Sequence, residues 1–445
     1  MLDKAKEIKE EDLISLNQEF NSNRVNKALM TASNKCNLQD LVYVKEAKSL
    51  NPNYFSINIK TLPVANQKQS GRCWIFAGLN VLREIVAKKL NLDKFELSQN
   101  YIAYYDKIEK VNYALESIID LLDKDYDDRT LKTILAYPVG DGGQWDMFKN
   151  LIKKYGVMPK MAMEETFSSS HTRESSILIN RRIRKFAYQA KELHEQNKDN
   201  EVIELKNEVL KELYNLINIS FGTPATKFDF EYVDKDQNYH IKKDLTPKEF
   251  YEKYVGIDID NYVSIINAPT KDKPFHDTFT VDYIGNVIGG NPIKYLNLPM
   301  NEFKERVISQ LKSGEVVWFG SDCSKFADRA GGLWAPEQYD YSILGIDVSF
   351  DKAAMLNYSE SAMNHAMVIT GVNLDGDKPN RWKIENSWGK DVAMDGYFTA
   401  TDKWFNEAVF QAVVNKKYLT KEEQDELNKE PHHLNPWDPM GTLAD

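Results

Sequence analysis

The stretch Gln67-Lys68-Gln69-Ser70-Gly71-Arg72-Cys73-Trp74 joins a polar, glycine-containing loop to a predicted helix. After it, apolar residues recur at three- and four-residue steps, which predicts a helix with one apolar stripe that begins near Cys73. The stripe consists of Ile75, Leu79, Leu82, Val86 and Leu90. Backbone N–H groups at a helix start lack intrahelical partners, and the positive end of the helix dipole lies there. Both features stabilise a thiolate, so the pattern predicts a nucleophilic Cys73.

Cys73 has a second interpretation as a small buried hydrophobic residue, which is common for free cysteines. The other two cysteines, Cys36 and Cys323, follow no glycine-containing loop into a helix and have no evident partner, so we interpret them as structural or surface thiols. Three cysteines in 445 residues are too few for a disulfide framework and suit a reducing compartment. The N-terminus lacks the apolar region of a signal peptide. The sequence therefore predicts a cytoplasmic protein.

His365 is the candidate for the base that a cysteine nucleophile needs. It precedes an apolar run at 366–370, which predicts a strand, and a side chain at the start of a strand can project into a cleft from a rigid element. The other histidines occupy polar, turn or C-terminal segments and are interpreted as solvated or packed residues. They are His171, His194, His240, His276, His432 and His433.

Asn386 and Gln67 are the candidates for supporting roles. Asn386 follows the next predicted strand, so its side-chain carbonyl can accept a hydrogen bond from one ring nitrogen of His365 and leave the other nitrogen facing the thiol. Gln67 precedes Cys73 by six residues and can place its amide beside the Cys73 backbone N–H as an oxyanion hole. Trp388 either shields the His365–Asn386 hydrogen bond from water or is a core indole.

Composition and missing motifs argue against several other classes of protein. The formal net charge of −10 and the pI of 5.4 disfavour a nucleic-acid-binding protein, which needs an excess of Lys and Arg. There is no CxxC and no HExxH, so no metal site is predicted. No phosphate-binding or dinucleotide fingerprint is present, and no cofactor is predicted. No apolar run of about 18 residues predicts a membrane span.

Patterning along the chain predicts an α+β protein with a helical lobe packed against a sheet lobe, because helical periodicity precedes a series of strands. Two amphipathic helices joined near 197–200 are expected within a charged middle region. Prolines near the C-terminus argue against a helix there and predict an extended arm. The expected divisions are an N-terminal segment packing on the catalytic core at 1–60, a helical lobe with the nucleophile at 61–165, a mainly helical insertion at 166–300, a β lobe with His365 and Asn386 at 301–430, and the arm at 431–445.

Several motifs taken together resemble the papain superfamily, and within it the family of bleomycin hydrolase and bacterial aminopeptidase C. The motifs are QKQSGRCWIFA, GDGGQWDMF, NHAMVITG, KIENSWG and PWDPMGTLAD, which span the chain from about residue 60 onward. The resemblance implies a papain-like two-lobed fold, with an antiparallel, barrel-like β lobe. It also implies that Cys73, His365, Asn386 and Gln67 are nucleophile, base, orienter and oxyanion donor.

The same resemblance implies further properties. Gly142 and Gly143 would pair with the substrate backbone, although a simple turn explains them equally well. The chain would form a homohexamer, with the 166–300 insertion supporting assembly. The arm would lie in the active-site cleft, where a terminal carboxylate at Ala444 or Asp445 pairs with the substrate's α-ammonium group. Asp445 is either trimmed off or shifts this stop by one residue.

The expected activity is therefore that of a cytoplasmic cysteine aminopeptidase, which releases N-terminal residues from peptides through a thioester acyl-enzyme. An endopeptidase on the same scaffold is the first alternative. A nucleic-acid-binding ring is a second, disfavoured by the acidic balance. A transglutaminase-like acyltransferase is a third, disfavoured because Asn386 stands where that class normally has Asp.

Overall fold

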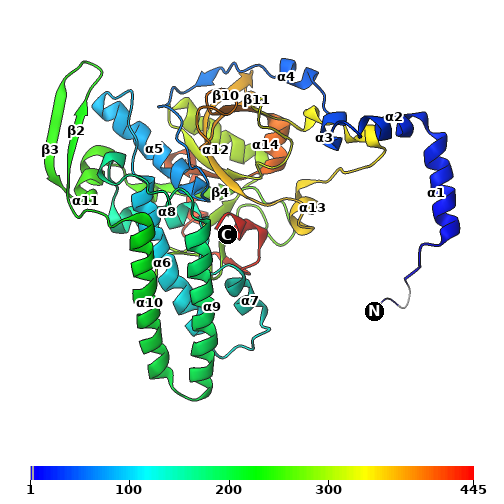
Figure 1. The fold of residues 1–445 in the computed structure, drawn as a ribbon. Helices are drawn as coiled ribbons and strands as arrows, with labels where there is room; N and C mark the ends of the chain where they lie inside the picture. Colours follow the sequence, from blue (N-terminus) through cyan, green and yellow to red (C-terminus); the bar gives the residue numbers. More distant parts are fainter. Residues whose placement is uncertain (1, 3–4, 445) are drawn as a thin grey trace.

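A group of helices packs against a long mixed sheet in the computed structural model, which describes residues 2 and 5–444 (Figure 1). Residues with helical periodicity form the first half of the chain, as predicted. The helices up to residue 221 are α1 (Glu10–Ser22), α2 (Arg24–Ala32), α3 (Leu38–Leu41), α4 (Glu46–Leu50), α5 (Cys73–Leu90), α6 (Gln99–Asp120), α7 (Arg129–Ala136), α8 (Trp145–Tyr155), α9 (Arg173–Glu195) and α10 (Asp199–Phe221). Later helices are α11 (Pro247–Phe250), α12 (Met300–Lys312), α13 (Lys352–Asn357), α14 (Asp402–Ala408) and α15 (Lys421–Glu426).

The main sheet runs in the order β14-β5-β6-β4-β13-β7-β10-β11-β12-β9-β8, and β1 pairs separately with β10. Neighbours from β4 to β12 along this path are antiparallel. The strands are β1 (Ile57–Asn58), β4 (Tyr262–Ile266), β5 (Thr278–Val281), β6 (Tyr295–Asn297), β7 (Val317–Ser321), β8 (Ala327–Asp328), β9 (Leu333–Trp334), β10 (His365–Asp375), β11 (Lys378–Glu385), β12 (Tyr397–Thr401), β13 (Val409–Asn415) and β14 (His432–Leu434).

Strand β10 lies between two hydrophobic cores. Ala366 and Val368 belong to the core that the helical lobe shares, whereas Met367 and Ile369 belong to a second core on the other face. Because successive side chains of a strand point to opposite faces, a strand covered on both sides is a continuous apolar run. The run at 366–370 is such a strand, and α5 packs directly against it. The helix and strand predicted to carry the nucleophile and the base are thus neighbours.

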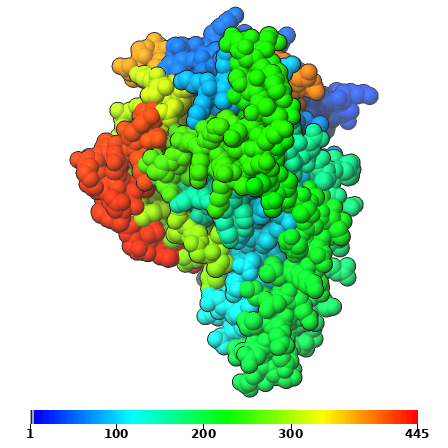
Figure 2. Space-filling model, turned by 90° about the vertical axis from the view of Figure 1, so that its left-hand side faces the viewer, coloured from blue at the N-terminus to red at the C-terminus, as the bar shows by residue number. Residues whose placement is uncertain are grey.

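The middle region is helical only in its first part. The predicted pair of amphipathic helices is confirmed as α9 and α10, which form a long hairpin that protrudes from the body and makes the lower end of the molecule in Figure 2. Beyond residue 221, however, the range to 300 contains a two-stranded hairpin of β2 (Phe228–Val233) and β3 (Tyr239–Leu245) and also β4 to β6. Phe228 and Phe230 are buried and alternate with an exposed residue, which is the pattern of a strand. The prediction that 166–300 is mainly helical therefore holds only up to α10.

The N-terminal segment differs from the expectation in a similar way. Val42 and Ala47 are buried and β1 joins β10, so the part from about 42 to 60 packs on the core. Helices α1 and α2 bury no side chain and project away from the body (Figure 1). Their amphipathic pattern does not bring them onto the core of their own chain.

The C-terminal arm begins as an extended segment, with β14 pairing in parallel with β5. Its last part, Pro439–Ala444, is a 3₁₀ helix, which the proline content had argued against. Proline is compatible with the first position of a helix because its missing N–H has no intrahelical partner there.

Candidate active site

The structure brings Cys73 and the start of β10 into contact. Cys73 is the first residue of α5, as predicted, and its side chain is only 5% exposed. The backbone N–H of Ala366 donates a hydrogen bond to Cys73 Sγ at 3.3 Å. Since Ala366 directly follows His365, the thiol and the imidazole belong to one buried site, although 292 residues separate them in the chain.

His365 is oriented by Asn386, as the strand pattern predicted. Strands β10 and β11 are antiparallel neighbours, and Asn386 follows the last residue of β11. Asn386 Oδ1 accepts a hydrogen bond from His365 Nε2 at 2.8 Å and another from the Ser387 backbone N–H at 2.7 Å. In the neutral imidazole this leaves Nδ1 as the nitrogen that can accept a proton.

Trp388 covers the imidazole. Its ring stacks on that of His365 with the centroids 5.1 Å apart and the planes 28° from parallel. Trp388 also makes an edge contact with Trp334, which belongs to the core of the β lobe. The shielding role and the packing role that the sequence left open are therefore both compatible with its position.

Ser387, which follows Asn386, holds Gln67 beside the site. Ser387 donates its hydroxyl hydrogen to Gln67 Oε1 at 2.5 Å, and the Gln67 backbone N–H donates to the Ser387 carbonyl at 2.8 Å. The Gln67 amide donates one hydrogen bond to the Ser70 carbonyl at 2.7 Å. A primary amide has two N–H groups, so the second remains for an oxyanion. Ser387 is a supporting residue that sequence reasoning did not single out.

Burial opposes the thiolate that a helix start favours. It raises the pKa of the Cys73 thiol to about 11, although hydrogen bonds from the backbone N–H groups of Ala366 and Trp74 act in the opposite direction. Burial also lowers the pKa of His365 to about 4, against the hydrogen bond to Asn386, which raises it. Burial therefore disfavours the charged form of each group in this arrangement.

A buried ion pair fixes the loop in front of Cys73. Lys107 Nζ lies 2.6 Å from Asp141 Oδ1, and Asp141 Oδ2 accepts from the Gly71 backbone N–H at 2.9 Å. Burial tends to raise the pKa of the Asp141 carboxyl, but Lys107 and hydrogen bonds from Thr172 and Gly71 outweigh it and lower the pKa. Sequence reasoning did not single out this pair, because Lys107 lies within a helix and Asp141 within a glycine-rich turn.

Gly142 and Gly143 lie next to this ion pair. A Cβ at Gly143 would come within 2.5 Å of the Trp74 ring, so close packing on that indole is sufficient to require glycine there. The Gly142 carbonyl accepts a hydrogen bond from Lys110. The contact with Trp74 explains Gly143 in the absence of substrate, whereas the carbonyl contact does not by itself require glycine at 142, and pairing of either with a substrate backbone stays a prediction.

The C-terminal arm is anchored on β6, on the residue before α8 and on the segment before β10. The Met440 carbonyl accepts hydrogen bonds from Tyr295 Oη at 3.0 Å and Gln144 Nε2 at 3.4 Å, and Thr442 donates to the Met363 carbonyl at 2.8 Å. Leu443 is buried. Ala444, which was predicted to contact substrate, lines a small cavity beside Lys110. Asp445 lies outside the described residues.

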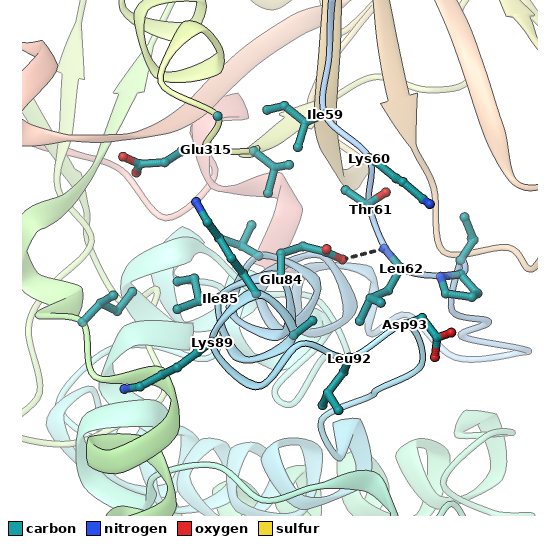
Figure 3. Close-up of a pocket in the computed structure, with 18 of the residues that line it drawn as sticks. Ile59, Lys60, Thr61, Leu62, Glu84, Ile85, Lys89, Leu92, Asp93 and Glu315 are labelled. Atoms are coloured by element: carbon teal, nitrogen blue, oxygen red, sulfur yellow. Dashed lines mark hydrogen bonds between the residues drawn. The ribbon is translucent and has the colours of Figure 1, made fainter. Parts of the chain in front are cut away.

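A cavity of about 1230 Å³ lies at the other end of α5 (Figure 3). Glu84 on its wall accepts a hydrogen bond from the Leu62 backbone N–H at 3.0 Å, and Lys89 and Glu315 also line it. Neither Cys73 nor His365 lines this cavity. This cavity is therefore separate from the site of Cys73 and His365.

Within residues 2 and 5–444, no group of three or more His, Cys, Asp or Glu side chains is placed to hold a metal ion. Over the same residues, no helix is long and apolar enough to cross a membrane.

The chain is similar to known peptidases over nearly its whole length. The model of the peptidase C1-like family matches residues 7–441. Aminopeptidase C of Lactobacillus delbrueckii subsp. lactis is 48% identical over 395 residues, covering 88% of both chains, and aminopeptidase C of Lactobacillus helveticus is 44% identical over 99% of both. The crystal structure of pepw from Lactobacillus rhamnosis has a TM-score of 0.96 and 44% identity, covering 98% of this chain and 99% of that one.

Proposed function

The chain belongs to the peptidase C1-like family and is a cysteine-type aminopeptidase, and from this premise we propose that Cys73, His365 and Asn386 are its catalytic triad. The observation that supports this assignment best is the pair of hydrogen bonds at the start of β10. One joins Cys73 Sγ to the residue after His365, and the other fixes the His365 ring through Nε2. The papain-like fold brings these groups together from distant parts of the sequence.

In the proposed reaction the thiol proton of Cys73 passes to His365 Nδ1 as Sγ attacks the carbonyl carbon of the first peptide bond. The backbone N–H of Cys73 and the free amide N–H of Gln67 stabilise the oxyanion of the tetrahedral intermediate. The imidazolium then gives its proton to the leaving nitrogen, the C–N bond breaks, and a thioester remains on Cys73. Water attacks the thioester in the same way, which releases the N-terminal residue and restores the thiol.

We further propose that the C-terminal arm restricts cleavage to the N-terminus. Its support is the anchorage of Met440 and Thr442 near Gln144 and Met363, close to the strand start that carries His365. An arm held there blocks the space that residues before the cleaved bond would occupy in an endopeptidase. In this proposal the carboxylate at the chain end, with Ala444 or Asp445, binds the substrate's α-ammonium group, and Gly142 and Gly143 pair with the substrate backbone.

The proposed assembly is a homohexamer in the cytoplasm. Helices α1 and α2 leave apolar side chains such as Leu13, Leu16 and Val25 exposed, and isolated helices of this length are only marginally stable in water, which favours a cover supplied by other subunits. The free thiols Cys36, Cys73 and Cys323 suit a reducing compartment. Light scattering coupled to size-exclusion chromatography tests the assembly directly.

The decisive experiment compares one peptide with a free N-terminus and the same peptide N-acetylated, each with wild type and with Cys73→Ala, by mass spectrometry. We expect stepwise loss of N-terminal residues from the free peptide only, and no cleavage by Cys73→Ala. Cleavage of the acetylated peptide would support the endopeptidase alternative. Full activity of Cys73→Ala would remove Cys73 from the mechanism.

A further inference from the structure

Arg329 occupies an unusual position beside the catalytic histidine. It lies in the turn between β8 and β9 and is exposed. Its guanidinium carbon is 4.8 Å from the centre of the Trp388 ring, and Trp388 stacks on His365. The Trp388 indole thus contacts both the exposed guanidinium of Arg329 and the imidazole of His365.

This cation has no anionic partner among residues 2 and 5–444, where Arg329 forms no ion pair. The adjacent carboxylate of Asp328 is occupied elsewhere, because Asp328 Oδ2 accepts from Tyr43 Oη at 3.1 Å and Oδ1 accepts from the Gly331 backbone N–H at 2.7 Å. A guanidinium is always charged at physiological pH and presents a planar fork of N–H donors that matches a carboxylate.

An unpaired cation here is unfavourable for catalysis by itself. Besides burial, which has the larger effect, the charge of Arg329 lowers the pKa of His365. It therefore disfavours the imidazolium that must form when the thiol gives up its proton. A negative group bound to Arg329 during the reaction would remove this penalty, and a substrate is the natural source of such a group.

The contacts of the arm indicate which part of the substrate reaches Arg329. The arm is anchored at Gln144 and Met363, whereas Trp388 is bridged to Asn66, in the loop that carries the oxyanion donor. In the proposed function the arm occupies the side before the cleaved bond. The leaving residue, whose nitrogen takes the proton from His365, therefore lies on the side of Trp388 and Arg329.

Resting on that proposed function, we propose that Arg329 binds the α-carboxylate of the residue that follows the cleaved bond, so that dipeptides with a free C-terminus are favoured substrates. The residue after the cleaved bond in a dipeptide is also its last residue, and its carboxylate is within two bonds of the leaving nitrogen. Binding it to Arg329 pairs the guanidinium and lowers the electrostatic cost of protonating His365. Longer peptides and C-terminal amides lack this carboxylate at that position.

The test measures kcat/KM for leucyl-alanine and for its C-terminal amide. Because charge-assisted hydrogen bonds are strong, we expect the wild-type kcat/KM to be about 10-fold higher for the free dipeptide than for the amide. This ratio should decrease as the salt concentration is raised. Arg329→Met should bring the ratio close to one, and Arg329→Lys should retain part of it because the charge remains without the fork. Lys390→Met, which also removes one exposed positive charge shortly after Trp388, is the matched control and should keep the wild-type ratio.

A binding measurement separates this inference from the proposed function. In the Cys73→Ala background, calorimetry should show tighter binding of the free dipeptide than of the amide, and Arg329→Met should abolish the difference whether or not the wild type cleaves either compound. An equal loss on both compounds, or an unchanged ratio in Arg329→Met, would contradict the inference. Cleavage by wild type without any preference for the free carboxylate would also contradict it.

Discussion

Arg83 and Glu385 form a buried ion pair, with 2.7 Å between Arg83 Nη2 and Glu385 Oε1, that joins α5, which begins at Cys73, to β11, which ends just before Asn386. Both side chains are 1% exposed. Arg83 lies in α5 behind Cys73, and Glu385 directly precedes Asn386. Asn80 of α5 also donates to Glu385, at 3.0 Å. The distance between the thiol and the imidazole therefore depends on a contact outside the triad.

Removing one partner of this pair should destabilise the protein and lower its kcat/KM. Burial raises the pKa of Glu385 and Arg83 counteracts this, so the pair has a high desolvation cost. Glu385→Ala removes the nearer anionic partner of the buried Arg83 guanidinium and leaves it only Glu84, at 3.2 Å, so we expect the free energy of unfolding to fall by about 3 kcal/mol, the lower end of the range for a broken buried pair. Denaturant unfolding and kcat/KM measure the two effects. The control is Arg83→Met combined with Glu385→Met, which should recover much of the stability; equal losses in the single and double variants would contradict the interpretation.

The residues of the proposed triad could be located from the sequence because each lies in a short local pattern. A glycine-containing loop before an apolar stripe placed Cys73 at a helix start, and an apolar run behind His365 placed it at a strand start. Neighbouring strands along the chain often pair, which brought Asn386 to His365. These inferences needed no knowledge of long-range packing.

The residues that support the site could not be found in this way. Lys107 and Asp141 meet only because α6 packs beside the loop before Cys73, and Arg83 meets Glu385 only when the two lobes are assembled. Likewise, the burial of both ring and thiol is a property of the complete fold, so the sequence overestimated the stability of the thiolate. The sequence also did not show that α1 and α2 project from the body, because the whole segment 1–60 was expected to pack on the core.

Gln67 and Ser387 offer a graded test of the oxyanion hole. Gln67→Ala should lower kcat by about 10²–10³ with little change in KM, because a donor to the transition state is lost. Ser387→Ala leaves the donor in place but removes the hydroxyl that holds Gln67 Oε1, so a smaller loss of about fivefold is expected. Steady-state kinetics on one aminoacyl arylamide measures both. Equal effects of the two substitutions would argue that Gln67 has only a packing role.

The pH dependence should reflect the burial of the thiol and the imidazole. With the pKa of His365 lowered to about 4, the imidazole is neutral and able to accept the thiol proton above that pH, and protonation abolishes activity below it. We expect kcat/KM for an arylamide with an uncharged leaving group to fall on the acid side near pH 4. On the alkaline side, activity should persist toward the Cys73 pKa of about 11. Arg329→Met should shift the acid limb upward. An acid limb at pH 6.5, the ordinary value for histidine, would contradict this prediction.

Gly143→Ala tests how tightly the site is packed. The added Cβ would meet the Trp74 ring, which cannot withdraw freely because Trp74 Nε1 donates to the Asp141 carbonyl at 2.7 Å. We expect a loss of about 1–3 kcal/mol in stability, measured by denaturant unfolding, and a lower kcat because Trp74 directly follows the nucleophile. Combining Gly143→Ala with Trp74→Phe, a smaller ring, should restore part of the stability. Unchanged stability in Gly143→Ala would show that the indole has room to move.

Truncation after Met440 tests whether the arm limits cleavage to the N-terminus. Removing residues 441–445 makes Met440 the terminal residue, whose carboxylate oxygens can still accept hydrogen bonds from Tyr295 and Gln144, and it opens the space next to Met363. We expect the truncated enzyme to cleave N-acetylated peptides and to release less free amino acid, as judged by mass spectrometry of the products. Loss of the buried Leu443 also costs about 1.5–3 kcal/mol of stability. Full-length Leu443→Ala is therefore the matched control, since it loses the same packing but keeps the length of the arm, and it should leave acetylated peptides intact. If the truncated enzyme and this control gave the same products as wild type, the arm would have no part in restricting cleavage to the N-terminus.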